Sequence, residues 1–133
     1  MYLSPPVLDA LGTMSLIKKA IAGFFLLPLL DAPWLFLQMS ASQAMFSKIQ
    51  GGRAVQMTLW PAIIVYIALT YLLLQQTSVW GAALSGSAVY AVYDFTNLAV
   101  FKDYTLQFAI ADSIWGGVLF ALAFTILRHF FPL

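Results

Sequence analysis

The chain has 133 residues, of which 62% are hydrophobic and 8% are charged, and its formal net charge is +1. An ordinary soluble domain carries about 25% charged residues, so we predict that most of the surface of this chain faces lipid rather than water. Six basic residues against five acidic ones exclude nucleic-acid binding, which needs a basic face able to neutralise several phosphates. The sequence contains no cysteine, which excludes disulfides and thiolate chemistry.

The first half of the sequence predicts two membrane spans. Residues 1–17 contain Ser4-Pro5-Pro6 and no basic start, so we expect a loosely ordered tail and no cleavable signal peptide. A first span is predicted over 20–39, after the Lys18-Lys19 pair. Residues 40–56 read as a polar loop broken at Gly51-Gly52, with room for a short interfacial helix before the break. The second span, over 57–74, contains no charged residue.

The second half predicts a helical hairpin. Apolar runs over 79–101 and 106–127 are separated only by the turn KDYT at 102–105. Each of the four runs approaches the roughly 20 residues needed to cross a bilayer, and none alternates as a barrel strand does. We therefore predict an all-α, multi-pass integral membrane protein, with residues 1–133 forming one four-helix domain. Basic residues divide equally between the two faces, and the paired lysines favour an N-terminus on the inside.

Three of the five aspartates fall inside predicted spans, where a charged residue costs about 2.5–3.5 kcal/mol. They are Asp31, Asp94 and Asp112. If successive spans alternate in direction, the three lie roughly 12, 9 and 9 Å below the same surface at about 1.5 Å per residue. The sequence thus predicts a layer of three carboxylates from three helices.

Residues at helical spacing accompany each carboxylate. Trp34, Asn97 and Trp115 each follow one of the three aspartates by three positions, and Tyr90 precedes Asp94 by four, so each pair shares one helix face. Such polar groups can simply hold helices together. Three carboxylates at one depth favour a functional site, because ionisable residues inside a membrane are candidate functional residues. We predict ion or solute binding by Asp31, Asp94, Asn97 and Asp112.

Three stretches resemble the pattern of a known family: LDAPWL (30–35), YDFTNLAVFKDYTL (93–106) and ADSIWGGVL (111–119). The chain is similar to a family of small four-span membrane proteins catalogued as domain of unknown function 2177. Its members carry LDxxWL in the first span, YDxTNL near the end of the third and DxxWG in the fourth. The resemblance implies four spans and a set of residues that support the predicted binding site, but it implies no reaction. The positions of this chain that match the family's characteristic residues are Asp31, Trp34, Tyr93, Asp94, Thr96, Asn97, Lys102, Asp112, Trp115 and Gly116.

Three functions are compatible with these residues. The first is transport of a proton, a cation or a small cationic solute. Closely spaced carboxylates cannot all ionise cheaply, so at least one is expected to hold a proton; four spans are few for a pathway, so a homo-oligomer is expected. The second is a structural or accessory subunit of a membrane or lipid-modifying enzyme. The third is a membrane enzyme that uses paired aspartates. We rank transport first and catalysis last, and we predict no catalytic residue, no metal and no cofactor.

Overall fold

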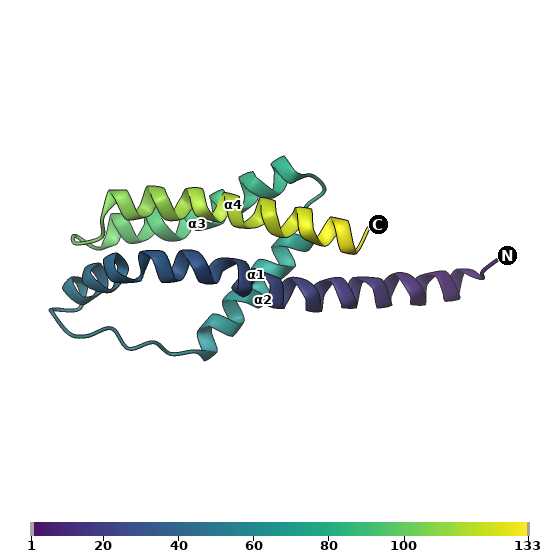
Figure 1. Ribbon diagram of the computed structural model, residues 1–133, viewed down its shortest axis with the longest axis horizontal. Helices are drawn as coiled ribbons and strands as arrows, with labels where there is room; N and C mark the ends of the chain where they lie inside the picture. The colour runs from purple at the N-terminus through teal and green to yellow at the C-terminus, as the bar shows by residue number, and fades with distance from the viewer. Residues whose placement is uncertain (1, 133) are drawn as a thin grey trace.

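The computed structural model describes residues 2–132, and within this range the chain forms four α-helices and no strand. The helices are α1 (Pro5–Ile49), α2 (Trp60–Leu74), α3 (Val79–Val100) and α4 (Leu106–Phe130). In Figure 1, α1, α3 and α4 run along the long axis of the molecule, and α2 crosses α1 at a steep angle. The α3–α4 turn and the end of α1 share one end of the molecule, and the two termini lie toward the other.

The first helix is longer than the sequence predicted. It is a single helix of 45 residues, so the expected loose tail over 1–17 is wrong from Pro5 onward, and the expected loop over 40–56 is helical up to Ile49. Prolines at the first helical positions favour a helix start, because the N–H group that proline lacks would have no partner there. The helix ends before Gly51 and Gly52, whose φ angles of 75° and 86° are left-handed and stop helical propagation.

The N-terminal part of α1 extends beyond the other three helices (Figure 1). At about 1.5 Å per residue the whole helix is roughly 68 Å long, more than twice the ~30 Å hydrocarbon thickness of a bilayer. Leu8, Leu11 and Met14 in this segment are exposed.

Two of the four helices, α1 and α4, are long and apolar enough to cross a membrane. The α2 helix is apolar but has 15 residues, or about 22 Å of helix. The α3 helix has 22 residues, and its serines, glycines, Asp94 and Asn97 make it less apolar. Crossing of the bilayer by α2 and α3 therefore stays a prediction.

The α3–α4 pair is the most closely packed part of the molecule. Ser78 caps α3 by accepting the Gly81 N–H at 2.9 Å, and Thr105 caps α4 by accepting the Phe108 N–H at 3.2 Å. The two backbones touch where Gly86 meets Gly116: a Cβ atom on Gly116 would lie 2.6 Å from the Gly86 carbonyl oxygen. Small residues at this crossing allow the two backbones to approach closely.

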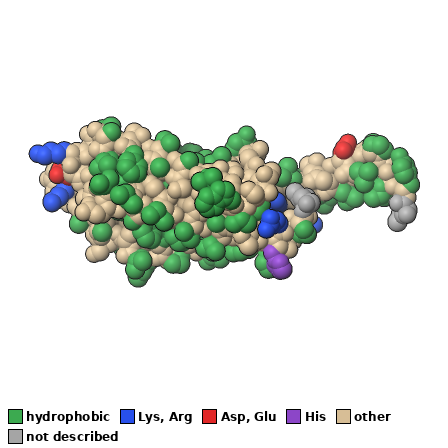
Figure 2. Space-filling view, turned by 90° about the horizontal axis from the view of Figure 1, so that it is seen from above, with side chains coloured by type: hydrophobic (Ala, Val, Ile, Leu, Met, Phe, Trp, Pro, Cys, Tyr) green, Lys and Arg blue, Asp and Glu red, His purple; other side chains and the backbone are tan. Residues whose placement is uncertain are grey.

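Apolar packing fills the half of the bundle on the far side from the α3–α4 turn. All four helices contribute to the buried cluster there, which consists of Leu27, Leu69, Leu73, Ala82, Leu119, Phe120, Ala123, Phe124 and Leu127. The exterior is also apolar, since Leu29, Phe36 and Leu37 are each more than two thirds exposed. In Figure 2, charged side chains gather near the two ends of the bundle, and hydrophobic side chains are spread over the surface between them. A surface of this kind suits a lipid environment.

Candidate functional site

The three predicted aspartates come together in the middle of the bundle. Asp31 is contributed by α1, Asp94 by α3 and Asp112 by α4, and their side chains are 4%, 0% and 8% exposed. Burial of this degree is costly for a carboxylate unless its oxygens accept hydrogen bonds. The bonds that these oxygens accept therefore determine what the site can do.

Asp31 accepts two hydrogen bonds from two different helices. The phenol of Tyr66 on α2 donates to one carboxylate oxygen at 2.6 Å, and the indole N–H of Trp115 on α4 donates to the other at 2.7 Å. Both carboxylate oxygens of Asp31 are thus satisfied. Since the donors lie on α2 and α4, Asp31 ties these helices to α1.

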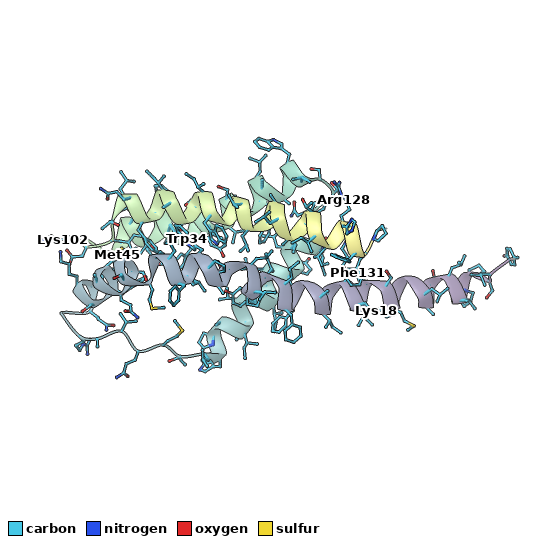
Figure 3. The ribbon with its side chains drawn as sticks, viewed as in Figure 1. Lys18, Trp34, Met45, Lys102, Arg128 and Phe131 are labelled. Atoms are coloured by element: carbon cyan, nitrogen blue, oxygen red, sulfur yellow. The ribbon has the colours of Figure 1, made fainter. Side chains whose placement is uncertain are left out.

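Asp112 accepts the reciprocal bond. The indole N–H of Trp34, three residues after Asp31, donates to Asp112 at 2.9 Å. The rings of Trp34 and Trp115 stack with their centroids 5.7 Å apart and an interplanar angle of 17°. Figure 3 shows Trp34 directed from α1 toward the α3–α4 pair. Each tryptophan therefore binds the aspartate of the opposite helix rather than the one on its own helix, and we call these four residues the Asp–Trp clasp.

Asp94 is the most completely buried of the three aspartates and has a different environment. One of its oxygens accepts a hydrogen bond of 2.6 Å from the phenol of Tyr104, in the α3–α4 turn. The other oxygen, Oδ2, is buried without a donor among the described residues. The second carboxyl group close to Asp94 is that of Asp112 on α4. A proton on one of the two carboxyl groups would remove the repulsion between like charges.

Tyr104 joins this pair to the turn. The side chain is 3% exposed and packs against Met45 and Ala109. Burial and the hydrogen bond to Asp94 both raise the pKa of the Tyr104 phenol. The phenol therefore keeps its proton and stays a donor to Asp94 at neutral pH. The donors that these aspartates meet are all neutral, being two phenols and two indoles.

Two further polar side chains surround the carboxylates. Tyr90 is close enough to the three aspartates to be affected by their charge, and its ring packs against Gly116, where a Cβ would overlap it. Asn97 is half-buried beside Tyr93 and Tyr104. The structure thus brings the three predicted aspartates together and places Asn97 beside Tyr104, the donor to Asp94. The role of these four residues in binding stays a prediction.

Three supporting residues of the predicted set lie apart from the carboxylate layer. Tyr93 is 54% exposed, and Thr96 is exposed on the outer side of α3. Lys102 is exposed at the turn, at the end of the molecule seen in Figure 3. The carboxylate oxygens of Asp94 meet Tyr104 and Asp112 instead of this lysine.

Two residues of the site were missed from the sequence, Tyr66 and Tyr104. Tyr66 lies in an apolar helix without a charged residue, and Tyr104 lies in the KDYT turn between the third and fourth spans. Gln38 is a further half-buried polar residue, four residues after Trp34 and hence on the same face of α1. Its side-chain oxygen is buried without a donor among the residues described.

Comparison with known proteins places the chain in a family but beside no characterised relative. The search of curated proteins and the search of solved structures each found no match. The model of the family described as "Predicted membrane protein (DUF2177)" matches residues 16–127. This range contains the clasp, Asp94 and Tyr104. It begins inside α1 and leaves out the overhanging start of that helix. The chain belongs to this family of predicted membrane proteins.

Proposed function

We propose that this membrane protein binds and moves protons, with the Asp94–Asp112 pair as the exchangeable site. The observation that carries the proposal is the second oxygen of Asp94, which is fully buried and has no donor among the described residues. The Asp94 side chain is also close to a second carboxyl group, that of Asp112. Buried acids that are not neutralised by a basic residue are typical of proton relays in membrane proteins.

A proton fits this site better than a larger cation. The stacked indoles of Trp34 and Trp115 occupy the space between α1 and α4, and both oxygens of Asp31 are already bound to donors. A metal ion or an organic cation would have to displace these groups. A proton needs no cavity, because it adds to an oxygen that lacks a donor. We therefore place the proton ahead of the other solutes.

Proton flux into liposomes tests the proposal. Purified protein is reconstituted in vesicles that contain a pH-sensitive dye, and a potassium gradient with valinomycin drives proton entry. We expect flux above that of protein-free vesicles, and a large loss of that flux in Asp94→Asn and Asp112→Asn. Asp9→Asn is the matched control, because Asp9 is exposed on the overhanging part of α1. Equal flux in the wild type and in both site variants would refute the proposal.

Proton movement by four helices is expected to need a homo-oligomer, since one copy offers few helices to enclose a pathway. The apolar exterior described above offers surfaces for both lipid and further copies. Native mass spectrometry from detergent or nanodiscs measures the number of copies directly. A protein that is monomeric there and still conducts protons would contradict this part of the proposal.

A structural or accessory role is the second candidate, and the hydrogen bonds of the three aspartates favour it. Four hydrogen bonds from four different aromatic donors tie three aspartates to α1, α2, α4 and the α3–α4 turn, as expected of polar groups that specify helix packing. Asp94→Asn separates the two roles. The amide keeps an acceptor for Tyr104 and offers a donor to Asp112, so a packing role survives the change, whereas proton exchange at residue 94 does not.

A further inference from the structure

Polar and apolar side chains divide the bundle into two halves along its axis. From the carboxylate layer toward the α3–α4 turn lie Asn97, Tyr104 and the half-buried Gln38. In the other direction lies the apolar cluster, which extends along α4 from Trp115 to Leu127, or about 18 Å of helix. Asp112, in contrast, is only six residues from the start of α4, or about 9 Å.

A pocket also lies between the end of α1 and the turn that contains Tyr104. Its volume is about 210 Å³, and it is lined by Ala41, Ala44, Met45, Lys48, Asp103 and Thr105. Asp103 and Thr105 flank Tyr104 in the sequence, and Met45 packs against the Tyr104 ring. Met45 also accepts the Thr105 N–H at 3.3 Å through its sulfur atom, which fixes α1 against the turn. The pocket is thus lined by the two sequence neighbours of Tyr104 and by Met45, which packs against it.

From these features we infer that the Asp94–Asp112 pair exchanges protons with only one face of the membrane, through this pocket and the Tyr104 phenol. The phenol reaches Asp94 from the turn and donates to it at 2.6 Å. The opposite face is closed by the stacked indoles and the apolar cluster. This inference rests on the proposed function and adds to it the side of access. Transfer across the bilayer then requires a second conformation in which the pair opens to the other face.

Other titratable groups surround the Asp94–Asp112 pair, and a tryptophan bonded to Asp112 makes proton exchange at the pair observable. The titratable groups closest to the pair are Asp31 on α1, Tyr90 on α3 and Tyr104 in the turn. Tyr66 on α2 donates to Asp31, and the more exposed Tyr93 on α3 lies outside this group. Trp34 donates to Asp112, so its fluorescence reports the charge of that carboxyl. Replacing the exposed Trp60 and Trp80 by phenylalanine removes the two indoles that lie far from the site.

The experiment is a stopped-flow pH jump on the protein in nanodiscs, where buffer reaches both faces. Because the chain has no cysteine, one cysteine can be placed at the pocket (Ala44→Cys) or at the α2–α3 turn (Thr77→Cys) and modified with a bulky charged thiol reagent. We expect the fluorescence change to slow by about tenfold or more after modification at position 44, and to keep its rate after modification at position 77. Tyr104→Phe is expected to slow it as well, with the exposed Tyr71→Phe as its control.

The amplitude and the rate separate the two proposals. A pH-dependent fluorescence change that disappears in Asp112→Asn and Asp94→Asn supports proton binding by the pair, and its absence from the wild-type protein would overturn the proposed function. If the change is present but its rate is unaffected by the adduct at position 44, or is slowed equally by the adduct at position 77, access through the turn is refuted while proton binding stands.

Discussion

Replacing Trp115 by phenylalanine removes one hydrogen bond of the Asp–Trp clasp while keeping an aromatic ring in place. The lost bond is the 2.7 Å contact from the indole N–H to Asp31, and Asp31 keeps only its bond from Tyr66. Hydrogen bonds to charged groups contribute about 1.5–3 kcal/mol in soluble proteins, and those between membrane helices average about 0.6 and reach about 1.7 kcal/mol. Since this bond is short and buried, we expect a loss of about 1–2 kcal/mol in the free energy of unfolding.

Titration with sodium dodecyl sulfate in mixed micelles, followed by far-ultraviolet circular dichroism, measures this loss without relying on tryptophan emission. Trp80→Phe is the matched control, because this indole is 72% exposed and its replacement should cost less than about 0.5 kcal/mol. Equal losses in the two variants would refute the assignment of the bond. In a double-mutant cycle with Asp31→Asn, we expect a coupling energy within the range of about 0.5–3 kcal/mol seen for contacting residues.

Two further substitutions test the packing around the site. Gly116→Ala places a methyl group where the Tyr90 ring and the backbone of α3 already lie, so we expect destabilisation by about 1–3 kcal/mol in the same titration; Gly12→Ala, with nothing within 4 Å, should be neutral or slightly stabilising. Tyr66→Phe removes a 2.6 Å bond and should cost about 1 kcal/mol, whereas Tyr71→Phe on the exposed side of α2 should cost nothing measurable. A Tyr66 variant as stable as the Tyr71 variant would contradict the geometry.

The positions of three helices were close to those expected from the sequence, because continuous apolar runs separated by short turns leave few alternatives. The error over α1 came from two local signals. Pro5 and Pro6 read as helix breakers but occupy the first helical positions, where they favour a helix. The polar stretch after Met39 read as a loop, but Met45 and Phe46 pack near Tyr104, and this tertiary contact holds the helix in place.

The layer of carboxylates could be predicted, but the way its members pair could not. A spacing of three residues shows that Asp31 and Trp34 share a face, and it also means that both point at the neighbouring helix. Which residue of that helix each one meets depends on the register between α1 and α4, and one sequence contains no information on register. In the structure, Trp115 lies opposite Asp31 and Asp112 opposite Trp34, so the bonds run between helices. Tyr66 could not be found for the same reason.

The close fit between α3 and α4 has a consequence for how the chain enters a membrane during its synthesis. Asp94 and Asn97 make α3 a poor span by itself, and it is not among the helices apolar enough to cross a membrane. Beside α4, with the Gly86–Gly116 contact already made, Asp94 is covered by Tyr104 and faces Asp112 rather than lipid. We therefore expect that α3 enters the bilayer only together with α4, as a hairpin, and that a chain arrested before α4 has emerged from the ribosome leaves α3 outside.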